Sequence, residues 1–199
     1  VHVAVDGVYA GYLILSDLPR PDAAESIRAL KAQGVRRVVM LTGDAPEAAA
    51  RMARQVGVDE VRAQLLPQDK VAELETLLSR QPAGGRTVYV GDGINDAPVL
   101  SRADVGIAMG AMGSDAAIEA ADIVLMDDRL SKLPEAMAIA RRTMTVVRQN
   151  IWFALGVKFG VLVLGALGMA SMWAAVFADV GVAFLAILNA MRCLRPVKH

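Results

Sequence analysis

The stretch TVYVGDGIND, residues 87–96, decides the fold of this 199-residue chain. An apolar run at 87–90 is typical of a buried strand, and a glycine-flexible turn carrying Asp92, Asn95 and Asp96 follows it directly. Open parallel sheets bind ligands at the carboxyl ends of their strands. Such a turn can hold Mg²⁺ through a carboxylate while a substrate phosphate supplies further oxygens. The stretch therefore predicts a parallel α/β sheet with a phosphate site, although a plain acidic turn has the same composition.

Two more polar positions occur before it in the chain. Thr42, Gly43 and Asp44 follow an apolar run and precede a helix expected at 46–56, whose first amides can face an anion. Lys70 lies near the start of the next expected helix. A Thr-Gly-Asp turn alone is usually only a helix start, and a single lysine is usually a solvated surface residue. The three features together, in this order, indicate a phosphate-handling site.

Apolar segments and amphipathic segments alternate on both sides of these loops. Strands that are apolar throughout, separated by amphipathic helices, imply a parallel sheet covered on both faces. We therefore expect a Rossmann-like α/β domain from about 15 to 128, preceded by a hairpin with its turn at Asp6 and Gly7. Asp22, with Glu25 three residues later, resembles a helix capping box. Strands are expected at 38–41, 87–90, 105–108 and 123–126, and helices at 22–34, 46–56, 68–78, 97–101 and 115–120.

The last third of the chain has a different composition. The whole sequence is 55% hydrophobic with a mean hydropathy of +0.41, and few ionisable residues follow Asn150. Segments 151–169 and 173–194 are each about 20 apolar residues long, enough to cross a hydrocarbon core of roughly 30 Å. The short link between them predicts an antiparallel transmembrane hairpin, with the lipid bilayer as partner. A buried soluble helical hairpin is the alternative.

Charge patterning predicts the orientation of this hairpin and excludes one class of partner. The short link carries no basic residue, so the positive-inside rule places both outer ends, and the α/β domain, in the cytoplasm. The formal charge is zero and no basic patch is interleaved with aromatics, so we expect no nucleic-acid partner. The flanking basic residues are Arg141, Arg142 and Arg148 before the hairpin and Arg192, Arg195 and Lys198 after it.

Lys158 and Asp179 are single charges inside these apolar segments. Each costs a few kcal/mol at the bilayer centre unless it is paired or hydrated. At a rise of about 1.5 Å per residue they lie roughly 18 and 12 Å from the turn, so both are near mid-membrane and can approach each other. One interpretation is a structural ion pair. The other is an ion site, with Asp179 as ligand and Lys158 as built-in countercharge.

The motifs resemble those of a known family. Residues 42–44, 67–70 and 91–98 look like the later phosphorylation-domain motifs of P-type ATPases, which belong to the haloacid dehalogenase-like fold. Residues 103–110 (ADVGIAMG) and 121–125 (ADIVL) are also similar, so the resemblance covers nearly the whole chain. It implies an ATP-driven ion pump that works through an aspartyl-phosphate intermediate, with Mg²⁺ and ATP as cofactors.

The resemblance also implies roles for the residues of the three loops. Thr42 and Gly43, in the motif with Asp44, would bind the transferred phosphoryl group, and Lys70 would neutralise it. Asp92 would coordinate Mg²⁺. Asn95 and Asp96 would position the loop and Lys70. Phosphoryl transfer needs placement and charge neutralisation more than covalent help, so these assignments are chemically sensible.

The last two helices resemble those of the branch that exports zinc, cadmium and lead. The similar segments are 150–158 (NIWFALGVK) and 173–192, with Asp179 at the centre of the second. A carboxylate suits a divalent borderline ion better than soft Cu(I). In that branch a cysteine pair from an earlier helix completes the site. We therefore expect an integral protein of the cell membrane that exports such ions.

One departure concerns the nucleophile, because the DKTGT motif of the family occurs nowhere in the 199 residues. We accordingly expect a carboxy-terminal fragment, inactive alone, whose partner is the upstream part of the same pump. In this interpretation 1–14 ends the nucleotide-binding domain, 15–148 is the phosphorylation domain, and 149–199 holds two transmembrane helices and a short tail. The alternatives are a soluble haloacid dehalogenase-like phosphatase and a non-catalytic membrane module.

Overall fold

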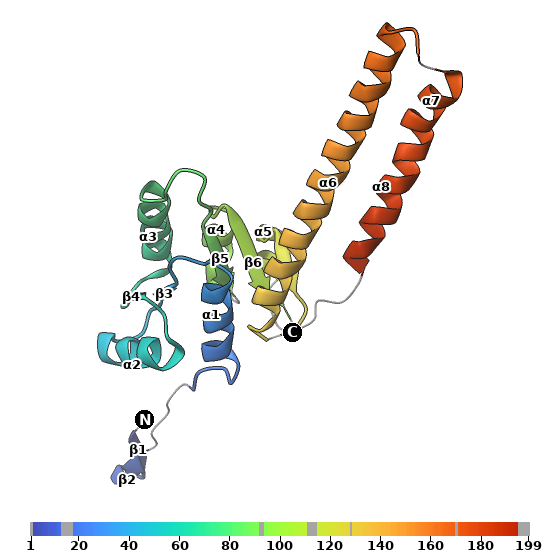
Figure 1. The fold of residues 1–199 in the computed structure, drawn as a ribbon. Helices are drawn as coiled ribbons and strands as arrows, with labels where there is room; N and C mark the ends of the chain where they lie inside the picture. Colours follow the sequence, from blue (N-terminus) through green and yellow to red (C-terminus); the bar gives the residue numbers. More distant parts are fainter. Residues whose placement is uncertain are drawn as a thin grey trace. The chain divides into compact units, whose positions relative to one another are not determined.

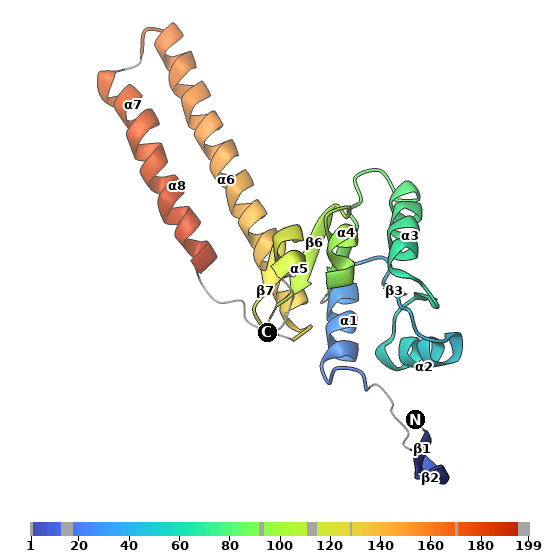
Figure 2. The same cartoon turned by 180° about the vertical axis from the view of Figure 1, so that it is seen from behind.

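The computed structural model describes residues 2–12, 18–91, 94–110, 115–127, 129–169 and 171–194. The chain divides into two compact units, residues 1–132 and 133–199, which are treated separately below. Figures 1 and 2 show the elements of both from opposite sides. The boundary expected at 148/149 falls inside helix α6 (Lys132–Ala166), which runs through it without a break.

The first unit begins with an antiparallel hairpin, β1 (His2–Val5) and β2 (Val8–Tyr12). Asp6 and Gly7 form its turn, with φ angles of 51° and 78°. Two consecutive positive φ angles are what a tight two-residue hairpin turn requires, and Asp-Gly is among the pairs that adopt them most readily. The predicted hairpin and its turn are confirmed.

Parallel strands form the frame of the first unit, as predicted. Strand β5 (Val88–Gly91) pairs with β6 (Val105–Met109), which pairs with β7 (Ile123–Leu125), all parallel. Strand β3 (Val39–Leu41) pairs in parallel with β4 (Glu60–Arg62). The sequence did not predict β4, because three residues with two charges carry no apolar signal. The helices are α1 (Ala23–Ala32), α2 (Pro46–Val56), α3 (Pro67–Ser79), α4 (Ala97–Leu100) and α5 (Asp115–Ala120).

The core beside the strands is built from small and medium apolar side chains. Leu100, Ala108 and Ala117 form a buried cluster from α4, β6 and α5. A Cβ on Gly106 would lie 2.5 Å from the carbonyl oxygen of Leu100, so α4 approaches β6 more closely than any side chain would allow. This packing fixes the segment that follows β5, where the polar loop residues lie.

The capping box expected at Asp22 is absent. Asp22 is the N-cap residue of α1, but its side chain makes no capping hydrogen bond. Its Oδ2 instead accepts a hydrogen bond of 2.8 Å from the backbone N–H of Ser131, 109 residues later. The prediction was wrong because a nearby backbone donor from the end of the first unit takes the carboxylate away from the helix.

Asp59 ties α1 to the β3–β4 pair. Its carboxylate accepts hydrogen bonds from Lys31 Nζ (2.6 Å) and from the backbone N–H of Val38 (2.7 Å). These two bonds, the lysine first, hold the pKa of Asp59 below its ordinary value of 3.8. Because both favour the charged form, they stabilise the folded state only where Asp59 is ionised.

We therefore expect Asp59→Asn to lower the denaturation midpoint of the protein at neutral pH. A group whose folded pKa is lowered contributes its stability above the unfolded pKa and loses it as pH falls through the folded value. The difference between the two proteins should be constant above about pH 5, begin to shrink near the ordinary pKa of 3.8 and disappear only when the pH falls below the lowered folded pKa. Urea unfolding of both proteins across this pH range measures it, and a gap that does not shrink as the pH falls below 3.8 would contradict the assignment.

The second unit is a hairpin of long apolar helices. Helix α6 is followed by a chain reversal, α7 (Met172–Val176), a π-helical segment η2 (Phe177–Gly181), α8 (Val182–Ala190) and a last 3₁₀ turn η3 (Met191–Leu194). The stretches Lys132–Ala166 and Phe177–Leu194 are both long and apolar enough to cross a membrane. Many large apolar side chains on them are exposed, among them Trp152, Phe159 and Phe184. Exposed apolar bands of this length fit a lipid environment.

Candidate functional site

The loop after β3 is held in place by backbone bonds. The Thr42 hydroxyl donates to Asp44 Oδ2 (2.8 Å) and accepts from the N–H of Asp44 (3.1 Å), which closes a compact turn. The N–H and C=O of Thr42 bond to Arg62 and Leu65 of the segment that leads into α3. A Cβ on Gly43 would lie 3.3 Å from the Leu65 carbonyl, so the backbone is already close there. The turn is thus fixed against the entry to α3.

Lys70 from α3 meets Asp96 from the turn after β5. Lys70 Nζ donates to Asp96 Oδ1 at 2.9 Å, and the two side chains are only 19% and 10% exposed. The Tyr89 hydroxyl also donates to Asp96 Oδ1, at 2.9 Å. A half-buried ammonium with one carboxylate partner keeps its direction fixed while remaining able to bind a second anion. Lys70 is therefore suited to a phosphoryl oxygen.

Tyr89 is a residue that sequence reasoning did not assign to the site. It lies within strand β5, and its aromatic ring was interpreted only as part of the apolar run. The only available signal was its phenolic hydroxyl, because a tyrosine hydroxyl generally finds a partner when buried. Tyr89 and Lys70 together leave Asp96 with a fully engaged Oδ1.

Gly91 allows the turn after β5 to fold back on its own strand. A Cβ at this position would lie 2.8 Å from Asp96 Cβ and 2.9 Å from Asp96 Oδ2. Asp96 ends a short 3₁₀ helix, η1 (Ile94–Asp96), directly before α4. Any side chain at residue 91 would push Asp96 away from Lys70, so glycine is a steric requirement here.

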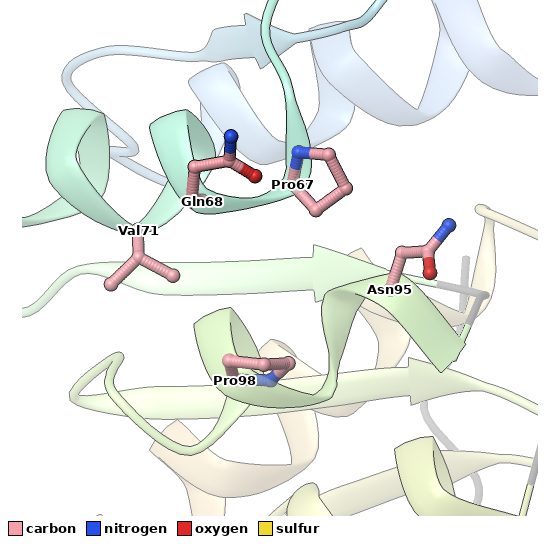
Figure 3. A pocket seen from close by; sticks show the side chains of 5 residues that line it. All are labelled: Pro67, Gln68, Val71, Asn95 and Pro98. Atoms are coloured by element: carbon pink, nitrogen blue, oxygen red, sulfur yellow. The ribbon is translucent and has the colours of Figure 1, made fainter.

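Asn95 lines a pocket beside this ion pair. The pocket has a volume of about 450 Å³ and is lined by Pro67, Gln68, Val71, Asn95 and Pro98. Figure 3 shows that Pro67, Gln68 and Val71 come from α3, while Asn95 and Pro98 follow β5. Asn95 is exposed. It therefore borders the site without joining the Lys70–Asp96 pair.

The predicted loop residues fall into two bonded groups. Thr42 bonds Asp44, and Lys70 bonds Asp96; in the part of the chain that the structure describes, no hydrogen bond or ion pair joins one group to the other. They are linked through the segment 62–66, which contacts the first and runs into the helix that carries the second. Asp92 lies outside the described residues.

The described residues contain no group of three or more His, Cys, Asp or Glu that could hold a metal ion. This does not conflict with Mg²⁺, which is usually bound through one or two carboxylates, with waters and substrate phosphate completing the shell. Asp96 is a poor candidate ligand because Lys70 and Tyr89 both use its Oδ1 and it is 7% exposed. The oxygen donors of the loops fit a hard cation.

The second unit brings together the two intramembrane charges. Lys158 Nζ lies 3.6 Å from Asp179 Oδ1, and the side chains are 59% and 78% exposed. The hairpin alone therefore does not cover this pair. Charges in apolar helices normally face a protein interior or a hydrated cavity, so the pair requires other groups or water around it in a membrane.

Asp179 occupies the centre of the π-helical segment η2. Such segments are rare and occur frequently at functional sites, because the extra residue per turn redirects a side chain. The Phe177 ring leans over Gly181, where an added Cβ would lie 2.5 Å from Phe177 Cδ2. The local geometry around Asp179 therefore depends on glycine at residue 181.

Comparison with known proteins supports one family. Residues 1–104 match the haloacid dehalogenase-like hydrolases. The chain is 55% identical to the cadmium, zinc and cobalt-transporting ATPase of Bacillus subtilis (strain 168), over 98% of this chain and 28% of that protein. It is 56% identical to the zinc-transporting ATPase of Synechocystis sp. (strain ATCC 27184 / PCC 6803 / Kazusa), over 96% of this chain and 26% of that protein.

A solved structure agrees with these relatives. A zinc-transporting PIB-type ATPase in its E2.Pi state matches with a TM-score of 0.85 and 44% identity, over 96% of this chain and 30% of that chain. The chain thus spans less than a third of the length of each of these three relatives. These relatives and the two apolar helices support an integral membrane protein. The chain belongs to the haloacid dehalogenase-like hydrolases and, within them, is a homologue of the heavy-metal-transporting P-type ATPases.

Proposed function

We propose that this chain supplies the phosphate-handling loops and the last membrane hairpin of an ATP-driven exporter of zinc, cadmium and lead. The observation that carries the proposal is the Lys158–Asp179 pair, 3.6 Å apart, within two apolar helices of a chain that also holds the Lys70–Asp96 pair. The Lys158–Asp179 pair within apolar helices does not fit a soluble phosphatase. The Lys70–Asp96 pair does not fit a membrane module without catalytic function.

In the phosphate site each residue has a chemical task. The Thr42 hydroxyl and the Gly43 amide bind oxygens of the transferred phosphoryl group, in the turn that also contains Asp44. Lys70 neutralises charge on the phosphoryl oxygens, held in place by Asp96 and, through it, by Tyr89. Asn95 helps to place the turn at the border of the pocket. Pre-placed donors of this kind stabilise the transition state without reorganisation at the moment of reaction.

Asp92 is the residue we assign to Mg²⁺. The bound cation would supply charge neutralisation at the phosphoryl oxygens, as in other phosphoryl-transfer enzymes. Gly91 and Gly93 flank Asp92 in the sequence. The aspartyl nucleophile comes from a part of the pump outside these 199 residues, since the sequence has no DKTGT motif.

In the membrane, Asp179 serves as a ligand of the transported ion and Lys158 as its countercharge. A carboxylate oxygen suits divalent zinc, cadmium and lead, and the ammonium replaces the ion as partner of Asp179 when the site is empty. The relatives named above transport cadmium, zinc or cobalt. The basic residues that flank the hairpin orient it with the α/β domain in the cytoplasm, and we place the pump in the cell membrane.

The direct experiment is phosphorylation by labelled ATP and Mg²⁺. We expect the pump that contains this chain to form a zinc-dependent, acid-stable phosphoenzyme, and the isolated 199-residue chain to form none, because Lys70 and Asp92 then have no nucleophile to serve. Acid-quenched gels measure both. Label on the isolated chain would overturn the division of the catalytic residues, and a pump labelled equally with and without zinc or cadmium would overturn the metal-export assignment.

A further inference from the structure

Two asparagines join the hairpin helices at one end. Asn150 Nδ2 on α6 donates to the backbone carbonyl of Ala186 on α8 (3.0 Å). Asn189 Nδ2 on α8 donates in return to Asn150 Oδ1 (2.8 Å). Both side chains are part-buried. These reciprocal bonds, called the asparagine clasp below, tie a side chain of one helix to both the backbone and a side chain of the other.

The clasp continues towards the ends of the helices. Arg192 Nη1 donates to Asn189 Oδ1 (2.9 Å), and Arg142 donates to the backbone carbonyl of Arg192. Asn189 Nδ2 also lies 3.4 Å from Gln149 Oε1. Both amide groups of the clasp therefore have donors and acceptors engaged, so the arrangement has one preferred axial alignment. Amide side chains between packed helices set such alignments because a shift leaves part-buried polar groups without partners.

The same axial alignment of α6 and α8 produces both the asparagine clasp and the Lys158–Asp179 pair. Lys158 is eight residues beyond Asn150 along α6, and Asp179 is ten residues before Asn189, so the pair lies about 12 to 15 Å from the clasp along the axes. Val157 and Val182 are each seven residues from the clasp, two helical turns, and hence on the same faces. Val182 is only 3% exposed, which agrees with its place on the inner face.

We propose that Asn150 and Asn189 are positioning residues that fix the axial register of α6 and α8 and thereby place Asp179 opposite Lys158. This inference rests on the proposed ion site. The asparagines are not ligands themselves, because about 12 Å separates them from the charge pair whereas zinc–ligand bonds are about 2 Å long. A slip by one helical turn, about 5.4 Å, would separate Lys158 from Asp179 entirely.

Cysteine cross-linking tests the register without reference to metal. In the pump, with Cys193 replaced by serine, Val157→Cys with Val182→Cys should form a disulfide on oxidation, whereas Val157→Cys with Ala178→Cys, one turn away, should not. Adding Asn150→Leu and Asn189→Leu together removes both amides of the clasp, and the Gln149 and Arg192 contacts with Asn189 are exposed to solvent, so this protein should still fold. We expect it to cross-link the second pair as readily as the first. An unchanged cross-linking pattern would overturn the clasp as the determinant of register.

Metal binding tests the positioning role. Co²⁺ is a visible probe of ligand number and geometry, so its absorption spectrum and chelator competition should report any displacement of Asp179. In Asn150→Leu, Asn189→Leu and the double variant we expect metal affinity to fall about threefold to twentyfold, the range that one lost interhelical hydrogen bond gives. Thr145→Val is the matched control, because within the part of the chain that the structure describes the Thr145 hydroxyl bonds the Arg141 carbonyl of its own helix.

The outcomes separate this inference from the proposed function. A shifted cross-linking pattern with an altered cobalt spectrum supports the positioning role, because a purely structural clasp would change stability and leave the spectrum unchanged. A shifted pattern with the normal spectrum and affinity would overturn it. If the unmutated pump gives no cobalt spectrum at all, the ion-site assignment and the positioning role are both refuted. The cross-linking result would still report the axial register of the two helices.

Discussion

Asp179→Ala should abolish zinc-stimulated ATP hydrolysis and stoichiometric zinc binding in the pump that contains this chain, while the protein still inserts into the membrane. The expectation follows from the place of Asp179 in η2, 3.6 Å from Lys158 and without cover from the hairpin itself. A structural ion pair gives a different result. Removal of one partner from such a pair leaves an unpaired charge in hydrocarbon and destabilises the protein.

The double variant Lys158→Met with Asp179→Leu separates these cases. If the pair is only structural, removing both charges should restore stability and transport together. If Asp179 is a ligand, the double variant should fold and fail to bind zinc. Thermal stability in detergent and equilibrium zinc binding, measured on the same preparation, give the answer. Zinc transport by the double variant would refute the ion-site assignment.

Lys70→Met should reduce the rate of phosphoenzyme formation by on the order of 10² to 10³ while leaving zinc binding in the membrane intact. One preorganised charged donor at a developing oxyanion is worth about that much. Here the donor is held at 2.9 Å from Asp96, only 19% exposed, where solvent screening is weak. Rapid-quench labelling with ATP at saturating Mg²⁺ measures the rate.

Two matched variants separate the effect of the lysine charge from that of its hydrogen-bonding partners. Lys70→Arg keeps the charge but changes its geometry, so it should retain part of the activity. Tyr89→Phe removes only the second donor to Asp96 and should cost far less than loss of the lysine. Equal rates in Lys70→Met and the unmutated pump would remove Lys70 from the phosphate site.

The sequence predicted those elements whose signals are local. Pro46 and Gly57 bound α2 as expected, since proline favours the first turn and Gly57 has the left-handed φ of 83° that ends helices. Apolar runs located β3, β5 and β6. Strand β4 was not predicted because its pairing with β3, rather than its composition, makes it a strand.

The contacts of the site could be predicted only in part. The loop motifs pointed to Lys70 and Asp96 separately, yet their pairing and the contribution of Tyr89 depend on how α3 packs beside α4 and on how α4 packs on β5. The asparagine clasp joins residues 39 positions apart, which no helical periodicity connects. The π-helical turn at Asp179 depends on a shift in backbone hydrogen bonding that leaves no residue signature beyond Gly181.

Helix α6 also has a mechanical consequence. It runs for 35 residues, about 50 Å, and contains no glycine or proline between Glu135 and Leu155. A helix of this length without such residues is a stiff rod. A tilt of about ten degrees at one end would displace the backbone at Lys158, about 40 Å away, by roughly 7 Å, and Asp179 would move with it because the asparagine clasp joins the two helices.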